Sequence, residues 1–575
     1  MVSLVPMNVL ITYVDTMALK RIFACVCFVL CWTASTSAFA MQPVAYEVAA
    51  RIERQASFES IEQRGGRLKV VMLPIALEFS YFYLIDKGIR SVAENHDVDY
   101  QMVGPQIYNP QLQRRMLQEI VEEGRADAIL FTSLDPQATA DVIEKAVSNG
   151  VLVIEINSDK TDFPTAIHGV VGYDQRKGAR KMGRWLSYAT QGKPTKVGVI
   201  GGSQGYHNTE RIEGFASGLE AGENLSLVGV ENGAYNTPES YFATRRLMRR
   251  HPEVRAIFAV NDNSVIGAHL ALRQMERDDV LLMGVDGDPA AIHRILHGDV
   301  SATVETNPHL IGQVAMQCVL DAMRGRFTGG FVEIPSEVVD KSNVHKSRYE
   351  QPQVSLDGVG RIALATELRQ GLVNKDGSGL YADIVRAVFK PVGIRVEFDV
   401  LPLQRAQEAL KLGRVDGMLA THNVPGGVYN RTQWHIDVDY LTAASRLGVK
   451  WKGQRSLRNS KVSWVRGIDY AEYLYPEFHL HEINHRASAL KMLHLGRLDF
   501  FLGLRSEIDK SMDDEDRQKL RLNDIFQLRS FITFTETPLG SALKKQFDDE
   551  FTRLLASGRL REIFRQWGRP YPFEH

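Results

Sequence analysis

The sequence predicts an α/β protein in which parallel strands alternate with helices, in two successive series separated by a polar break. The clearest unit is the segment 257–298, where strand, polar turn and helix occur twice in a row. Its short apolar runs at 257–260 and 281–285 are typical of parallel strands that are covered on both faces. The chain has 575 residues, enough for roughly three to four compact units at about 150 residues each.

Composition and charge exclude one class of partner. The chain carries 68 basic and 69 acidic residues, so it has no global field that would attract nucleic acid or an anionic membrane. No basic stripe interleaved with aromatic residues was found either. The sequence therefore predicts no nucleic-acid partner, and a hydrophobic content of 44% is sufficient for real cores.

The first 40 residues have the pattern of a secretory signal. Lys20 and Arg21 precede the apolar run 22–32, and the segment ends in small residues with a cleavage site after Ala40. We expect export to the periplasm, with the start codon left open between Met1 and Met17. Cleavage would leave Cys318 alone among the cysteines, as a small buried residue on a helix. No cofactor is predicted.

The first strand–helix series follows a leader at 41–67, whose apolar spacing (Val44, Val48, Ile52, Phe58) predicts a helix packed on the surface. Further strands are expected at 69–75, 100–103, 128–131, 152–156, 197–200 and 227–230. Helices such as 111–123 and 139–148 alternate with them. This alternation predicts right-handed crossovers and parallel sheets. Ligands bind outside the carboxyl ends of such strands, which makes Asn261 and Asp286 candidate contacts in one crevice.

Several ordered segments of this series resemble the ribose/galactose-type, or type I, periplasmic binding proteins. They are VGYDQRKGARKMG, ERIEGFASGL, AIFAVNDNSVIGA, LLMGVDGDPAA and SATVETNPHLIGQ. The resemblance covers residues 68–340 and implies two Rossmann-like lobes that close on a sugar in a hinge cleft. It also implies three chain crossings between the lobes, expected near Tyr173, Asn236 and Thr306.

The resemblance also implies ligand contacts. Arg211 falls on the family's ligand-binding arginine, Tyr235 on an aromatic at a hinge crossing, Asn261 on its asparagine and Asp286 on its aspartate, while Tyr81 and Phe82 stand where the family keeps stacking aromatics. Together, a carboxylate, a guanidinium and an amide can pair with neighbouring sugar hydroxyls. The alternative for Asn261 and Asp286 is that they only cap the helices that follow them.

Other positions depart from that pattern. Phe79 replaces a polar asparagine, Asn157 and Ser158 replace an Asp-Arg pair, and Thr306 replaces a glutamine. Asn157 and Thr306 remain candidate contacts, but half of the polar ring differs, so the resemblance does not imply ribose as the ligand. A less polar solute, bound by a sensor, stays open beside a transported sugar.

A polar linker at 341–357 separates this series from a second module at 358–575. Strands are expected at 361–365, 395–400 and 417–420, and helices at 381–392 and 403–412. The segments LQRAQEALKLGRVDGMLA, HRASALKMLHLGRLDFFLG and TPLGSALKKQFDDEFTRLLASGRLREIFRQWG resemble the type II, family 3 extracellular solute-binding proteins. The fold class predicted for the whole chain is thus two tandem periplasmic-binding-protein-like modules, each of two Rossmann-like α/β lobes around a hinge cleft.

The second resemblance implies a carboxylate clamp at Arg431, with Thr421 as a further contact, since a planar guanidinium suits a bidentate pair. Leu504 occupies the place of the acidic residue that holds an amino group, and Leu372 lies where a stacking aromatic is expected. Two alternatives stay open. The module binds a carboxylate without an essential amine, or it is a degenerate lobe pair that serves as a protein contact surface.

One motif favours an enzyme. The run from His481 to His485 satisfies H-E-x-x-H, the zinc-peptidase pattern, which requires both histidines on one face of a helix. Here Phe478 and Leu480 alternate with histidines as in a strand, and Asn484 suits the N-cap of a later helix. The motif therefore straddles a strand–helix junction, and an exported metal-dependent hydrolase is only a rival hypothesis.

The main expectation is a periplasmic solute-binding protein without enzymatic activity. It would capture a carbohydrate-like solute in the first module and a carboxylate, such as an organic acid or amino acid, in the second. Its partner would be the permease of an ABC transporter. The alternative is a sensory co-receptor that passes the ligand state to a membrane sensor kinase.

Overall fold

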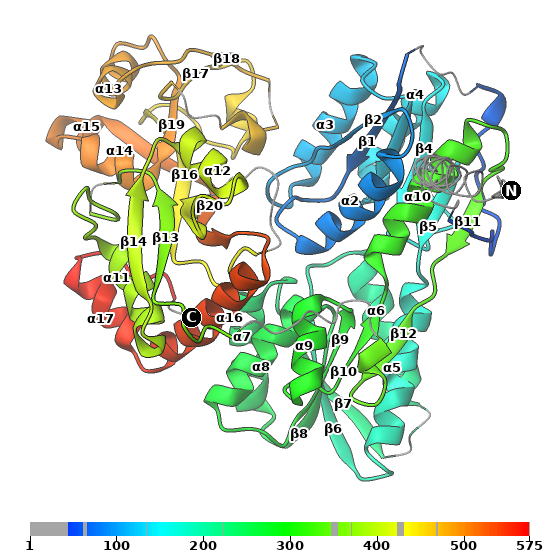
Figure 1. Ribbon diagram of the computed structural model, residues 1–575. Coiled ribbons are helices and arrows are strands. Elements are labelled where there is room, and N and C mark those ends of the chain that lie inside the picture. The colour runs from blue at the N-terminus through cyan, green and yellow to red at the C-terminus, as the bar shows by residue number, and fades with distance from the viewer. Residues whose placement is uncertain are drawn as a thin grey trace, which may run out of the picture.

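The computed structural model describes residues 44–573 apart from 61–65, 134, 221, 223, 347–354, 370, 422–429, 467–469 and 476. The expected signal sequence at 1–40 and the centre of the expected linker lie outside the described residues. In Figure 1 the first module occupies the right and lower parts of the molecule, and the second module lies beside both of its lobes.

The upper lobe is a six-stranded parallel sheet covered by helices on both faces. Its strand order is β11(Gly330–Glu333), β5(Gly169–Gly172), β4(Leu152–Ile156), β3(Ala128–Phe131), β1(Leu68–Leu73) and β2(Val98–Met102). Its helices are α2(Ser80–Ala93), α3(Pro110–Glu122), α4(Pro136–Ser148) and α10(Pro308–Ala322). The central strands are buried along their whole length, as expected for a parallel sheet.

The lower lobe repeats the plan. Its strand order is β12(Glu337–Asp340), β10(Ala302–Glu305), β9(Leu281–Asp286), β8(Val254–Ala259), β6(Thr195–Gly201) and β7(Leu225–Asn232), with only β12 antiparallel to its neighbour. Its helices are α5(Gln175–Ala189), α6(Tyr206–Leu219), α7(Thr237–Arg250), α8(Asp262–Gln274) and α9(Pro289–His297). The doubly wound parallel fold predicted for the first module is therefore confirmed.

The chain passes between the two lobes three times. It leaves the upper lobe after β5 at Tyr173, returns after β10 at Thr306, and crosses again between β11 and β12. The predictions near Tyr173 and Thr306 agree with this path, but the crossing predicted near Asn236 is wrong. Asn236 stays in the lower lobe, where its side chain caps α7 by accepting from Glu239 N.

The predicted helical leader is also wrong. In the described residues from 44 to 60, only the short 3-10 turn η1(Phe58–Ser60) is helical. The segment runs extended along the upper sheet, with bridges from Ala50 to Phe331 and from Gln55 to Ile167. Ile52 is buried there, so the leader packs on the lobe as expected, by adding backbone hydrogen bonds rather than a helical face.

Seven of the nine helices described in the first module start with the same chemical signal. A short polar N-cap accepts a hydrogen bond from the backbone two or three residues on, and in five helices proline follows at the start. The capping residues are Asn109, Asp135, Asp174, Asn236, Asn261, Asp288 and Asn307. These caps satisfy amide groups that have no partner within the helix and end each strand in a defined turn.

The second module is built on an eight-stranded mixed sheet. Its order is β14(Arg395–Val400), β13(Arg361–Thr366), β15(Gly417–Thr421), β20(Leu520–Phe534), β16(Asp437–Arg446), β19(Phe500–Leu504), β17(Lys461–Ser463) and β18(His479–Leu480). The long strands β16 and β20 pair antiparallel at its centre. The 3-10 turns are η2(Val344–Lys346), η3(Lys390–Val392), η4(Arg455–Leu457) and η5(Ala471–Tyr473).

The second module has two parts, a proximal half and a distal half, each with its own helices. The proximal half contains β13 to β15 with α11(Leu380–Phe389), α12(Leu403–Lys411), α16(Pro538–Ala556) and α17(Arg559–Gln566). The distal half contains β16 to β19 with α13(Arg486–His494), α14(Arg505–Ser511) and α15(Asp514–Lys519). Strand β20 pairs with both halves, through β15 on one side and β16 on the other.

The H-E-x-x-H run lies on a strand–helix junction, as predicted. β18 ends at Leu480 and α13 begins at Arg486, so His481 and His485 are not one helical turn apart. The N-cap is His485 rather than the predicted Asn484. Without that helix the run lacks the geometry that a zinc peptidase requires.

The two modules share one apolar core. Tyr241, Ile266 and Leu270 of the lower lobe belong to the same buried cluster as Trp434 and Phe551 of the second module. The Tyr241 and Trp434 rings meet edge to face, with centroids 5.4 Å apart. None of the helices in the described ranges is both long and apolar enough to cross a membrane.

We expect Trp434→Ala to destabilise both modules together. Truncating a buried tryptophan costs about 3–5 kcal/mol, and this one also loses its hydrogen bond to Thr552. Calorimetry should show the whole unfolding transition at a lower temperature. Leu412→Ala, at an exposed position, is the control and should change little. Two transitions of which only one moves would contradict a shared core.

Candidate ligand-binding site

The predicted contacts of the first module gather at the seam between its lobes, where the carboxyl ends of both sheets meet. Tyr81 and Asn157 come from the upper lobe, and Tyr235 and Asp286 come from the lower lobe. Thr306 lies at a crossing, directly after β10. The strand ends therefore bring these side chains together, as expected for an open α/β sheet.

Arg211, on α6, is the central charge of this seam. Its side chain is 6% exposed and makes four polar contacts, with Gln175 Oε1 at 2.9 Å, Val260 O at 2.6 Å, Tyr173 Oη at 2.6 Å and Asp286 Oδ1 at 3.4 Å. These partners come from three separate segments of the chain. A buried guanidinium requires such compensation, so Arg211 fixes the relative positions of its partners.

Tyr81 joins the upper lobe to the chain crossing at Thr306. Its hydroxyl donates to Asn157 Oδ1 at 3.2 Å and lies 2.9 Å from Thr306 Oγ1. Thr306 Oγ1 in turn donates to the Asp286 carbonyl at 3.0 Å. The polar groups of the upper and lower lobes thus bond to one another, and the seam is closed.

Asn261 caps the helix that follows it, which is one of the two roles that the sequence left open. Its Oδ1 caps α8 by accepting from Ser264 N, and its Nδ2 donates to the Tyr235 carbonyl at 3.1 Å. The structure thus supports the capping role directly, and the amide also holds the Tyr235 turn. A Cβ on Gly202 would meet the Tyr235 ring at 2.1 Å, so this ring requires glycine beneath it.

Three candidate residues have backbone conformations that favour glycine. The φ angles of Asn157, Tyr235 and Asp286 are 58°, 59° and 128°. Non-glycine residues in this region carry a conformational cost, and such residues tend to cluster at ligand sites. Their occurrence at one seam is a second reason to regard it as the site.

Burial controls the electrostatics of the seam. It raises the pKa of the Asp286 carboxyl to about 7, although the nearby Arg211 cation favours the charged form. Burial also raises the pKa of Asp159 to about 6 and lowers that of His207 to about 4. Asp286 can therefore change between hydrogen-bond donor and pure acceptor near neutral pH.

The structure separates one predicted contact from the rest and adds two. Phe82 is 3% exposed and belongs to the hydrophobic core, where it meets Tyr81 edge to face, so it is not part of the polar ring. Tyr173 and Gln175 were missed, yet they bond to each other and to Arg211. The hinge crossing predicted at Tyr173 was the sequence signal that pointed to them.

The second module's candidates have a different placement. Arg431 does not face a cleft of its own module. Its Nη2 donates to the Glu78 carbonyl of the upper lobe at 2.6 Å, and its guanidinium lies 4.4 Å from the centre of the Phe531 ring. Burial lowers the pKa of Arg431. The side chain of Thr421 lies outside the described residues.

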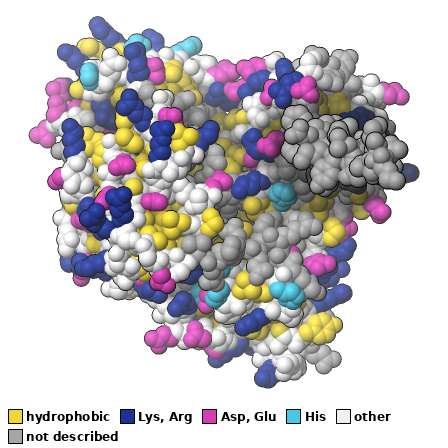
Figure 2. Space-filling model, in the orientation of Figure 1, with side chains coloured by type: hydrophobic (Ala, Val, Ile, Leu, Met, Phe, Trp, Pro, Cys, Tyr) yellow, Lys and Arg dark blue, Asp and Glu magenta, His cyan; other side chains and the backbone are white. Residues whose placement is uncertain are grey.

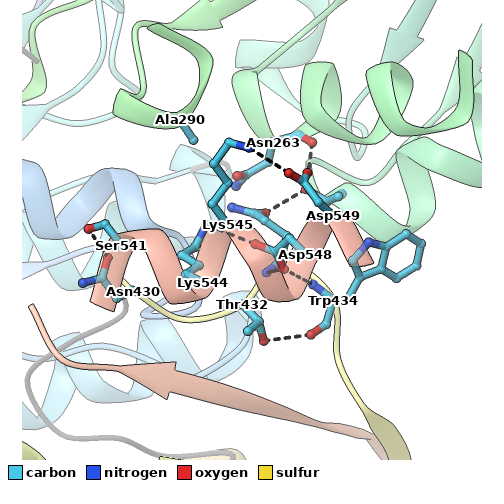
Figure 3. A network of polar contacts seen from close by, with 12 residues as sticks. Asn263, Ala290, Asn430, Thr432, Trp434, Ser541, Lys544, Lys545, Asp548 and Asp549 are labelled. Atoms are coloured by element: carbon cyan, nitrogen blue, oxygen red, sulfur yellow. Dashed lines mark hydrogen bonds and ion pairs between the residues drawn. The ribbon is translucent and has the colours of Figure 1, made fainter. Parts of the chain in front are cut away.

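A crevice of about 1040 Å³ separates the two modules in front of the seam. Phe79 and Tyr235 line it from the first module, and α16 lines it from the second. Figure 3 shows the polar residues of α16, of which Lys545 and Asp549 lie toward the lower lobe, while Lys544 and Asp548 lie toward the chain at Thr432 and Trp434. The second module therefore stands over the mouth of the first module's cleft.

The network in Figure 3 ties α16 to the chain before β16. Asp548 Oδ1 accepts from Gln433 N at 2.7 Å and from Trp434 N at 3.3 Å, and Lys544 Nζ lies 3.4 Å from Asp548 Oδ2. Arg294 of the lower lobe approaches Asp549 at 3.6 Å. Burial raises the pKa of Asp548, while these donors and the Lys544 cation favour its charged form.

Charged side chains of both signs are interspersed on the face that Figure 2 shows, over both modules. This distribution agrees with the even balance of acidic and basic residues in the sequence. The described surface in that view offers no single-sign field for steering a charged macromolecule.

Comparison with known proteins matches the first module. A model of the periplasmic binding protein domain matches residues 70–327. The ribose import binding protein of Bacillus subtilis is 28% identical over 247 residues, which are 43% of this chain and 78% of that protein. The D-ribose/D-allose-binding protein of Pseudomonas aeruginosa is 27% identical over 286 residues, 48% of this chain and 88% of that protein.

Among solved structures, the myo-inositol binding protein of Caulobacter is 25% identical with a TM-score of 0.46, and the match covers 50% of this chain and 98% of that one. Residues 70–327 thus match the periplasmic binding protein domain, in agreement with the two-lobed fold of the first module. The matching domain and relatives are binding proteins, which confirms the prediction of a binding protein rather than an enzyme.

We expect Asp286 to make stability depend on pH. Its folded pKa of about 7 lies above the ordinary value of 3.8, so its contribution is fully present below pH 3.8 and is lost as the pH rises through about 7. Asp286→Asn removes this titration. Thermal unfolding between pH 4 and 8 should show the variant gaining stability relative to wild type as the pH rises. A constant difference would contradict the raised pKa.

Proposed function

We propose that the chain is an exported solute-binding protein whose first module closes on a small carbohydrate-like molecule. The observation that carries this proposal is the concentration of donors and acceptors from both lobes at one closed seam, around Arg211 and Asp286. A sugar offers adjacent hydroxyls that donate and accept, and this set can pair with them. The ribose-, allose- and myo-inositol-binding proteins named above support the same class of solute.

The solute would take over hydrogen bonds that the seam now makes within the protein. The Tyr81 hydroxyl links Asn157 of the upper lobe to Thr306 at the crossing, and Thr306 in turn bonds to Asp286 of the lower lobe, which makes a short chain of such bonds. Opening the lobes breaks this chain and exposes its groups, and a bound hydroxyl can then restore each bond. The exchange keeps buried polar groups satisfied, which is the condition for tight and selective binding.

We propose delivery to the permease of an ABC transporter as the role, because the relatives include import binding proteins. The expected signal sequence supports a periplasmic location. A sensory co-receptor that acts on a membrane sensor kinase is the second candidate. It is favoured by one observation, namely that the second module contacts both lobes of the first.

For the second module we propose the two-lobed architecture of type II solute-binding proteins. It is supported by the division of its sheet into two halves joined by the long strands β16 and β20. An organic acid or amino acid remains the proposed ligand class for a cleft between these halves. Arg431 would have to leave Glu78 to clamp such a ligand.

The site can be tested with Tyr81→Phe, which keeps the ring and removes the hydroxyl. A thermal-shift panel of D-ribose, D-allose, D-arabinose and myo-inositol should first identify a solute that stabilises the wild type. Calorimetry should then show binding to the variant weakened by about tenfold, because one buried hydrogen bond is worth about 1–1.5 kcal/mol.

Tyr100→Phe is the matched control. Tyr100 lies in the same lobe but its hydroxyl donates to Asp86, away from the seam. Its removal should leave solute affinity unchanged. Equal affinities of both variants and the wild type would place the site elsewhere.

A further inference from the structure

We propose that the second module responds to closure of the first: its proximal half is fixed to the lower lobe by a shared apolar core, and both of its halves contact the upper lobe, the proximal half through Arg431 and the distal half through Leu474 and the packing of Ile107. Closing the lobes would then move its two halves relative to each other. This inference rests on the proposed function only in that the lobes open and close around a solute.

The fixed side is the contact with the lower lobe. Tyr241 and Ile266 share a core with Trp434, and Thr237 Oγ1 donates to Gln433 Oε1 at 2.7 Å. Arg529 adds an ion pair to Glu239 at 3.0 Å. Separating this surface would expose large buried apolar side chains, so the proximal half moves with the lower lobe.

The other side is the contact with the upper lobe, and its direct bonds are polar. Arg431 donates to the Glu78 carbonyl, and Lys87 Nζ lies 3.5 Å from Glu536 Oε2. Arg115 Nη1 donates to the Leu474 carbonyl of the distal half at 3.0 Å. Polar contacts of this kind can break and form again at small cost, because water replaces the lost partners.

A short path connects these contacts to the seam. Glu78 precedes α2, and Tyr81, three residues later, makes the bond across the lobes. The carboxylate of Glu78 accepts from Tyr108 N at 3.0 Å, and the neighbouring Ile107 packs against the distal half's core. One small region of the upper lobe therefore contacts the solute site, Arg431 and the distal half.

The second module can bend at the strands that join its two halves. Its proximal half is fixed to the lower lobe, and its distal half touches the upper lobe at Leu474 and Ile107. The two halves are joined through the long strands β16 and β20. A change in the angle between the lobes is thus applied across these strands, the place where two halves of one sheet can rotate.

The closed seam of the structure indicates the direction of the coupling between the Arg431 contact and solute binding. The Arg431 contact exists together with the closed seam, so it favours the closed lobes. Two equilibria that share a contact influence each other to the same extent. Removing the contact should therefore weaken solute binding in the first module, although Arg431 is not one of its proposed solute contacts.

The experiment compares three arginines by calorimetry on the full chain, with D-ribose or D-allose as the probe. Arg431→Ala and Arg115→Ala remove contacts to the upper lobe and should each weaken binding, Arg431→Ala by roughly five- to tenfold. Arg529→Ala is the matched control, since its partner Glu239 lies in the lower lobe. It should bind like the wild type.

Small-angle X-ray scattering without any solute gives an independent readout. Arg431→Ala and Arg115→Ala should shift the protein toward a more open, larger form, and Arg529→Ala should not. The Arg115 side chain is 32% exposed, so its variant keeps the test valid if Arg431→Ala folds poorly.

Two results would overturn the proposal. One is that Arg431→Ala and Arg115→Ala both keep the affinity and scattering of the wild type. The other is that Arg529→Ala has an effect as large as theirs. Failure of the proposed function is distinguished by Asp286→Ala: if that variant still binds the solute, the site is misplaced, while the comparison of the three arginines still reports the coupling. If neither sugar binds the wild type, the scattering arm alone decides.

Discussion

The buried guanidinium of Arg211 is the constraint on which the first module depends. A cation removed from water must find compensating partners, and here they come from the hinge, from the end of β8 and from the end of β9. Satisfying Arg211 brings Tyr173, Gln175 and Asp286 into register. Asp286, at the end of β9, has a backbone conformation that is unfavourable for a non-glycine residue, and its carboxylate turns toward the Arg211 guanidinium.

The hydrophobic pattern predicted eight of the twelve strands described in the first module and missed β5, β10, β11 and β12. The runs at 128–131 and 152–156 coincide with β3 and β4, because a strand buried on both faces leaves a continuous apolar run. The prediction of a helical leader was wrong because the pattern does not show which backbone partners are available. Val44, Val48 and Ile52 are spaced as in a helix, but an available sheet edge offered backbone partners to residues 49–56 that the pattern cannot reveal.

The family resemblance supplied Arg211, Tyr81 and Tyr235 as candidates, and the other candidates that the structure gathers at the seam follow strand ends. Asn157, Asp286 and Thr306 stand at such positions, and the structure brings them together. Arg431 shows what the sequence could not predict. Its sequence neighbourhood pointed to a cleft of its own module, whereas its observed partner is Glu78, 353 positions away in the chain. Contacts between modules leave no periodicity in a sequence.

The crevice between the modules has a kinetic consequence. Phe79 and Tyr235 line it beside the seam, and α16 forms its opposite wall. For the proposed solute, this crevice would be a passage between two folded bodies on one side of the cleft. Such a passage would slow arrival and departure alike, so that residence time as well as affinity would decide which solutes are retained.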